Sequence, residues 1–211
     1  VNMIDVRKIR KDFPMLDNTM MQGHKLVYFD SAATSLKPTC VLKAMEEYYT
    51  SYCSNVHRGD YDLAATTDKN YENAREKVAK FINCNTNEVV FTSGTTASIN
   101  LVAFGYALKH LSSGDEIILN EAEHASNILP WYEIASKNNL KIVFAPFNND
   151  GVVTLESIKK VVSEKTKLTV IIGEFGVANR KSISEMNEYF KYYRKQTKKL
   201  KIGILVFDDS H

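Results

Sequence analysis

The feature that most constrains the fold is an alternation of short apolar runs and helical segments from residue 88 onward. The runs read EVVFT, DEIILN, KIVFAPF, LTVII and IGILVF, and each is continuously apolar at its centre. Between them lie segments with apolar residues at helical spacing, such as Ile128, Trp131 and Ala135. Continuous apolar strands separated by helices are typical of parallel sheets covered on both faces. The sequence therefore predicts an α/β fold with a mostly parallel sheet.

The first 84 residues follow a different pattern. Apolar residues at helical spacing predict one helix over residues 41–52 and another over residues 71–81. Between them lies CSNVHRGDYDLAATT, which is polar and irregular and is interpreted as a structured loop. We therefore expect an N-terminal helical and loop segment, residues 1–84, followed by a large α/β domain, residues 85–211.

Composition disfavours several function classes. The net charge is +2, from 27 basic and 25 acidic side chains, so no strong field attracts nucleic acid or an anionic membrane. No apolar run approaches the ~20 residues of a membrane span. The cysteines, Cys40, Cys53 and Cys84, lack CxxC spacing, and no metal site is expected. An odd cysteine count and an N-terminus without a signal peptide's apolar middle predict a reduced, cytoplasmic location.

The segment FTSGTTASIN, residues 91–100, leads from the first apolar run into a helix. Gly94 would let the backbone approach a ligand, and Thr95 and Thr96 offer hydroxyls beside the free amides of a first helical turn. These are the parts of a small phosphate cup. It lacks the lysine and further glycines of a nucleotide-triphosphate loop, so a monophosphate fits better. The alternative is that Thr95 merely caps the helix.

Two more residues follow predicted strands, and ligands gather at the carboxyl ends of strands in such sheets. His124 comes after DEIILN, and Asp208 comes directly after IGILVF. Each also has an ordinary explanation, as a loop histidine with satisfied hydrogen bonds and as a helix cap. A phosphate cup, an imidazole and a carboxylate on one rim suit pyridoxal 5'-phosphate: the imidazole could stack on its ring and the carboxylate could keep the pyridine nitrogen protonated.

Motifs spread over the chain carry a family resemblance. They are DFPML, YFDSAATSLKP, NVHRGDYDLA, YENAREKVAKFI, EVVFTSGTTASINLVA, GDEIILNEAEHASNILPW and ILVFDDSH. In this order and spacing, from about Ile9 to the last residue, they resemble the class V aminotransferase family, most closely its cysteine desulfurase and selenocysteine lyase branch. The resemblance implies the large domain of a fold type I pyridoxal-phosphate enzyme.

The resemblance also implies roles for single residues. Thr95 and Thr96 would help to hold the cofactor phosphate. His124 would stack on the pyridine ring and assist proton transfer, and Asp208 would pair with the pyridine nitrogen. His211 stands where relatives commonly have a glutamine that hydrogen-bonds the ring oxygen, and histidine can also donate there.

Three further residues are implied on the substrate side. Ala32 and Ala33 would line it, and His57 would reach the active-site entrance. In this family the entrance forms between two subunits, so a homodimer is implied. The implied activity is release of sulfur from L-cysteine to leave alanine, for iron–sulfur cluster assembly or another sulfur-transfer pathway through an acceptor protein. Alternatives are a selenocysteine lyase, a kynureninase-like hydrolase, an epimerase, or a truncated or degenerate binding protein without catalysis.

The chain departs from the family pattern in places. Ser31 replaces the usual asparagine, and Phe175 stands where an asparagine would contact the cofactor ring, with Asn179 as a substitute only if the loop is rearranged. The cofactor-anchoring lysine, the sulfur-accepting cysteine and the carboxylate-binding arginine would all follow His211. We therefore expect the chain to be the N-terminal part of a longer enzyme and not to turn over cysteine by itself.

Overall fold

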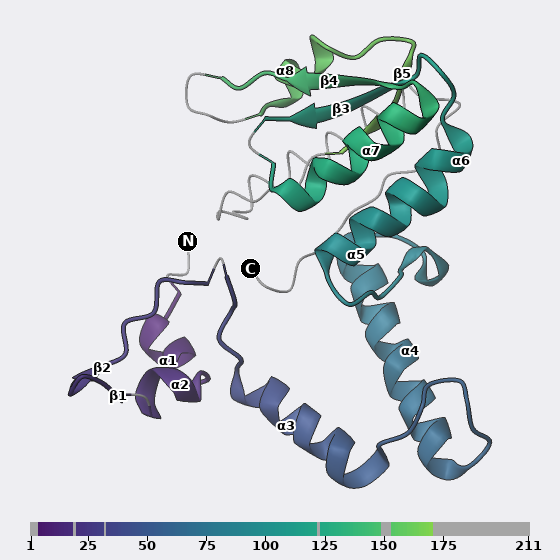
Figure 1. Cartoon of the computed structure of the whole chain (residues 1–211). Coiled ribbons are helices and arrows are strands. Elements are labelled where there is room, and N and C mark those ends of the chain that lie inside the picture. The colour runs from purple at the N-terminus through teal and green to yellow at the C-terminus, as the bar shows by residue number, and fades with distance from the viewer. Residues whose placement is uncertain (1–3, 19, 32, 122, 149–152, 171–211) are drawn as a thin grey trace. The chain divides into compact units, whose positions relative to one another are not determined.

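The computed structural model describes residues 4–18, 20–31, 33–121, 123–148 and 153–170. These fall into two compact units, the first ending at Phe91 and the second beginning at Thr92 (Figure 1). The expected domain division after residue 84 stays a prediction, because compactness does not show that either unit folds by itself. Among the helices of these ranges, none combines the length and apolarity that a membrane crossing requires.

The first unit is mainly helical, with one short hairpin. Its elements are α1 (Val6–Arg10), α2 (Pro14–Asn18), β1 (Met20–Met21), β2 (His24–Lys25), α3 (Thr39–Glu47), the π-helical η1 (Tyr48–Tyr52), α4 (Asp62–Ile82) and the 3₁₀ turn η2 (Thr86–Glu88). Gln22 and Gly23 join β1 to β2 with φ values of 52° and 80°, the conformation that a tight two-residue hairpin turn demands.

Helix α4 begins earlier than the sequence predicts. The residues DLAATT, 62–67, were expected in a loop, and this prediction is wrong because they form the first turns of α4. Ala64 and Thr67 are buried there, and the Thr67 hydroxyl donates to the Tyr52 carbonyl at 2.7 Å. A buried threonine with such a partner supports a helix that its polar sequence hides. The helix ends at Asn83, whose left-handed conformation (φ 57°) is a common helix stop.

The second unit is an α/β structure. It opens with a continuous helical run made of α5 (Thr95–Asn100), the π-helical η3 (Leu101–Ala107) and α6 (Leu108–His110). The remaining elements are β3 (Glu116–Asn120), the 3₁₀ turn η4 (Ala125–Asn127), α7 (Leu129–Asn138), β4 (Lys141–Ala145), α8 (Leu155–Lys159) and β5 (Thr166–Thr169). Thr154 caps α8 by accepting from the Ser157 amide at 3.1 Å.

The parallel sheet predicted from the sequence is confirmed in this unit. Its described strands are ordered β4-β3-β5, and both pairings are parallel. Figure 1 shows α7 and α8 on opposite sides of this sheet. The side chains of Ile117 and Leu119 join the core that contains Trp131 of α7, whereas Ile118 packs with Ile158 of α8. The central strand β3 is therefore buried on both faces.

The first predicted strand, EVVFT, is not a strand among the described residues. Val89 has an extended backbone, but residues 89–92 pair with no described strand. Instead, the Val89 carbonyl accepts a hydrogen bond from the Arg75 guanidinium of α4. Val90 is 66% exposed, so only part of the apolar run is covered by described residues. The final predicted strand, IGILVF, lies outside the described residues.

Glu116, at the amino end of β3, is a buried carboxylate that contacts all three strands. Its Oε2 accepts from the Ser163 hydroxyl at 2.6 Å and lies 3.4 Å from Thr166 Oγ1 of β5, while Oε1 lies 3.3 Å from Lys141 Nζ of β4. The Ser163 hydrogen bond and then the Lys141 ammonium hold the pKa of Glu116 below its ordinary value, against the opposing effect of burial.

Candidate functional site

Gly94 forms the opening of a cup at the start of α5. It is the N-cap residue, with φ of 144°, a value suited to glycine, and a Cβ placed there would meet nothing within 4 Å. The first helical hydrogen bond runs from the Ser98 amide to the Gly94 carbonyl at 3.1 Å. The amides of Thr95, Thr96 and Ala97 consequently have no partner among the described residues. Such amides, together with the helix dipole, favour an anion.

The hydroxyl of Thr95 is buried and has no partner in the part of the chain that the structure describes. Thr95 is 8% exposed, and its Oγ1 finds no hydrogen bond among the described residues. The alternative that Thr95 caps the helix is wrong, because the N-cap residue is Gly94 and no side chain caps α5. An unpaired buried hydroxyl costs about 1–3 kcal/mol. A bound anion with an oxygen at this position would remove that cost.

Thr92 orders the approach to the cup, a role that the sequence reasoning missed. Its Oγ1 accepts from the Gly94 amide at 3.4 Å and lies 3.0 Å from the Gly94 carbonyl and 2.6 Å from Ser98 Oγ. These contacts link the chain before Gly94 to the first turn of α5. A threonine two residues before a glycine is a known turn-forming pattern, and it was the available signal.

His124 follows β3 by four residues, as expected, and is the N-cap of η4. Its Nδ1 lies 3.2 Å from the Ser126 amide and 2.9 Å from the Ser126 hydroxyl. The ring is exposed, and its Nε2 has no hydrogen-bond partner among the described residues. The turn η4 packs against α5, so His124 and the cup lie at the N-termini of two elements that contact each other.

A buried polar network holds the loop that carries His124. The Glu123 carboxylate accepts a hydrogen bond from the side-chain amide of Asn120, at the end of β3, and another from Asn127 Nδ2 at 2.8 Å. Asn127 Oδ1 in turn accepts from the Trp131 indole of α7 at 3.0 Å. The sequence reasoning assigned Trp131 to packing and overlooked its partners. The available signal was the spacing of an acidic residue, an amide and an indole, each four positions after the one before it.

His57, in the first unit, is held by the acidic face of α4. Its backbone amide donates to Asp68 Oδ1 at 2.6 Å, and its Nε2 lies 3.1 Å from Glu72 Oε1. Its φ of 56° is uncommon for a residue other than glycine. Ala33, also in the first unit, lies in an exposed turn, and its backbone amide donates a hydrogen bond to the Asp30 carbonyl. Ala32, Asp208 and His211 lie outside the described residues.

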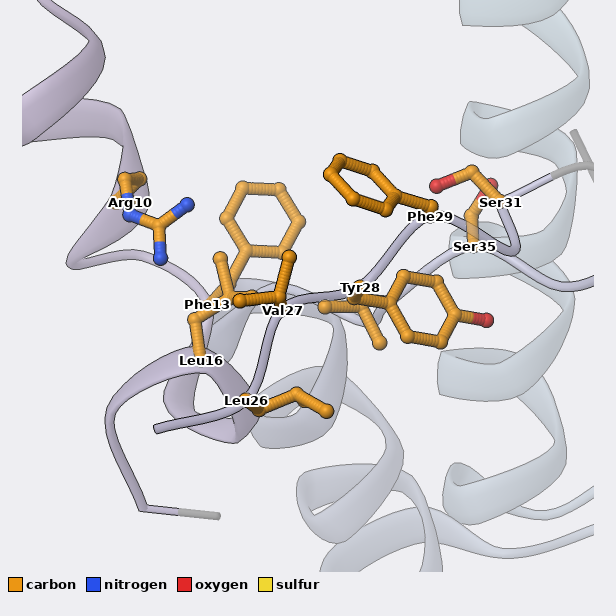
Figure 2. Close-up of a pocket in the computed structure, with 10 residues that line it drawn as sticks. Arg10, Phe13, Leu16, Leu26, Val27, Tyr28, Phe29, Ser31 and Ser35 are labelled. Atoms are coloured by element: carbon orange, nitrogen blue, oxygen red, sulfur yellow. The ribbon is translucent and has the colours of Figure 1, made fainter. Parts of the chain in front are cut away.

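A separate cavity of about 420 Å³ lies in the first unit (Figure 2). Figure 2 shows Phe13, Val27 and Phe29 along it, with Arg10 at one side and Ser31 at the other. The lining is mainly apolar and includes none of the residues predicted to bind the cofactor. We therefore base the candidate site on the cup and on His124.

Comparison with known proteins places these features in a family context. The family model for class V aminotransferases matches residues 27–192. A probable cysteine desulfurase of Halalkalibacterium halodurans is 44% identical over 170 residues, covering 80% of this chain and 42% of that protein. A probable cysteine desulfurase of Staphylococcus aureus strain COL is 46% identical over 168 residues, covering 79% of this chain and 40% of that protein.

A solved structure shows the same fold. The apo structure of a cysteine desulfurase from Thermococcus onnurineus NA1 matches with a TM-score of 0.70 and 37% identity, over 81% of this chain and 40% of that chain. The chain thus spans about two fifths of the length of each of these relatives.

Proposed function

Because this chain belongs to the class V aminotransferase family, we propose that it supplies the phosphate cup and the ring-stacking histidine of a pyridoxal-phosphate cysteine desulfurase. The observation that carries the proposal is the buried hydroxyl of Thr95, which has no hydrogen-bond partner among the described residues, beside three backbone amides that also have none there. The names of the relatives support L-cysteine as the substrate.

The cup fits a phosphate monoester in number and kind of donors. Thr95 offers its hydroxyl and amide, and Thr96 and Ala97 offer further amides at a helix N-terminus. Gly94 adds no side chain, so the ligand oxygens can approach the backbone closely. The cup residues would fix the position of the cofactor, and the exposed imidazole of His124 would lie against its ring.

When bound, the cofactor supplies a charged ring that takes up the electron pair released at the substrate α-carbon. Asp208 would keep the pyridine nitrogen protonated, and a carboxylate there favours the charged form. His211 would donate to the ring oxygen. These two roles rest on the family resemblance, because both residues lie outside the described ranges.

The activity of the whole protein is also a proposal. It would release sulfur from L-cysteine and leave alanine, in the cytoplasm, and pass the sulfur to an acceptor protein for iron–sulfur cluster assembly. A homodimer would place Ala32, Ala33 and His57 near the substrate entrance. This chain spans about two fifths of the length of the relatives compared above, so the activity is proposed for the full-length protein.

The test of the cofactor site uses pyridoxamine 5'-phosphate, which cannot form the adventitious Schiff bases that surface lysines make with an aldehyde. Isothermal titration of the 211-residue chain should show binding of pyridoxamine 5'-phosphate and much weaker binding of pyridoxamine. Equal affinity for the two compounds would overturn the phosphate cup.

The test of the activity uses the full-length protein. Alanine release from L-cysteine should exceed alanine release from L-selenocysteine and from L-kynurenine. A reversed preference would assign the protein to a sister activity, and no release from any of them would favour a binding protein. The cup would still stand in either case if the titration succeeds.

A further inference from the structure

We propose that Ser126 fixes His124 in a single neutral tautomer, with Nδ1 as hydrogen-bond acceptor and the proton on Nε2. The inference concerns the apo chain and is independent of any ligand. Its consequence for catalysis rests on the proposed function, in which His124 faces the cofactor and the substrate.

The assignment follows from one contact that has a fixed direction. The Ser126 backbone amide, 3.2 Å from His124 Nδ1, can only donate. Nδ1 must therefore present its lone pair, and a neutral imidazole then carries its proton on Nε2. The Ser126 hydroxyl, 2.9 Å from the same nitrogen, is free to rotate and donates to that lone pair as well. Two donors thus converge on Nδ1.

The backbone around His124 is pinned on both sides, which keeps this geometry in place. Glu123 and Asn127 flank the turn and are 7% and 0% exposed, and Asn127 Nδ2 donates to Glu123 Oε2 at 2.8 Å. The Asn127 amide also donates to the His124 carbonyl at 2.8 Å. Trp131 anchors Asn127 to α7. Glu123 and Ser126 are therefore positioning residues for His124.

The tautomer decides what His124 can do to a bound molecule. Nε2 is exposed and carries the proton, so it can donate a hydrogen bond but cannot accept a proton in this state. Taking a proton would require Nδ1 as the basic atom, and that would place an N–H against the Ser126 amide. His124 therefore stacks and donates a hydrogen bond from Nε2, and another group removes the substrate α-proton.

Nitrogen NMR tests the tautomer directly. Long-range ¹H–¹⁵N correlation of the 211-residue chain, labelled at histidine and held above the pH at which its imidazoles are protonated, distinguishes the two ring nitrogens. His124 is assigned with H124Q. His24 is the internal reference, because its side chain is exposed and has no hydrogen-bond or ion-pair partner among the described residues. We expect one pure Nε2–H pattern for His124 and an averaged pattern for His24. An averaged pattern or an Nδ1–H pattern for His124 would overturn the proposal.

Substitutions distinguish an effect on the tautomer of His124 from a general effect on folding. S126A removes the hydroxyl but keeps the amide, so the Nδ1 resonance should shift while the Nε2–H tautomer remains. E123Q should loosen the turn and move His124 toward the averaged pattern, with unchanged far-ultraviolet circular dichroism. S157A is the control: the Ser157 amide likewise donates to the side chain of its N-cap residue, Thr154, and this substitution should leave His124 unchanged. Identical His124 spectra in E123Q and the unmodified chain would remove Glu123 from the assignment.

Adding pyridoxamine 5'-phosphate keeps the two proposals apart. Binding should shift the Nε2 resonance and leave Nδ1 an acceptor. If the compound does not bind, the proposed function fails while the tautomer stands. If it binds and His124 shows an averaged pattern, the tautomer fails while the cofactor site stands.

Discussion

Replacing Thr95 by valine should raise stability and lower ligand affinity at once. Valine matches threonine in shape and removes only the hydroxyl that is buried without a partner among the described residues. Removing it should relieve about 1–3 kcal/mol of unpaired desolvation in the ligand-free chain. At about 2–4 °C per kcal/mol for a domain of this size, the melting temperature should rise by roughly 2–12 °C.

The same substitution should weaken binding of pyridoxamine 5'-phosphate. A hydrogen bond to a charged group contributes about 1.5–3 kcal/mol, so the dissociation constant should increase roughly 10- to 150-fold. Scanning calorimetry without ligand and isothermal titration with ligand measure the two effects separately. A higher melting temperature combined with a weaker affinity would indicate that the Thr95 hydroxyl serves ligand binding and not stability.

Thr67 provides a matched control. It is also buried, at 4% exposure, but its hydroxyl donates to the Tyr52 carbonyl and accepts from Ser54 Oγ. T67V should therefore destabilise the chain by about 1–3 kcal/mol. If T95V destabilises the ligand-free chain as T67V does, or binds the compound with unchanged affinity, the interpretation of the cup is refuted.

Other substitutions test the surroundings of the site. E116Q should lower the free energy of unfolding by about 1–3 kcal/mol at pH 7. Because folding lowers the pKa of Glu116, the stabilisation by its carboxylate is fully present above the ordinary glutamate pKa of about 4.3 and is lost as pH falls through the lowered value. The free energies of unfolding of E116Q and the unmodified chain, measured with urea, should therefore converge in acid. G94A should cost about 1–2 kcal/mol by backbone strain alone, since a Cβ has open space there, and calorimetry would show a neutral result as the contrary outcome. W131F removes the only tryptophan and its hydrogen bond to Asn127. Thermal unfolding followed by circular dichroism should show stability lowered by about 1–3 kcal/mol, and an unchanged melting temperature would count against the Glu123–Asn127–Trp131 network.

The elements that could be predicted are those whose burial is continuous. Strands β3, β4 and β5 were readable because each is apolar at its centre, and the parallel order follows from the helices between them. The first run, EVVFT, has the same composition, but a strand also needs a paired neighbour. No described strand pairs with it. Composition cannot report such a pairing.

The residues proposed to bind the cofactor could be predicted from the sequence, but the residues that position them could not. Gly94 and Thr95 were identified because glycine conformation and helix-start chemistry are local properties of the sequence. Glu123, Ser126 and Thr92 were missed because their roles depend on which donors and acceptors the folded chain brings within hydrogen-bond distance. The start of α4 was missed for a similar reason, since the partner of Thr67 lies 15 residues away in the sequence.

The two-sided burial of β3 has a consequence for where the site is built. A strand with one solvent-exposed face keeps its register with its neighbours because a shift by one residue would expose apolar side chains. In β3 this constraint is weak, because Ile117, Ile118 and Leu119 are all apolar and both faces are buried. The alignment is therefore favoured by the polar contacts that Glu116 makes outside β3, to Ser163 and to Lys141 of β4. A slip of one residue would move the chain about 3.3 Å along the sheet and carry His124 with it. Contacts of Glu116 at the amino end of β3 thus help to set the position of the imidazole beyond its carboxyl end.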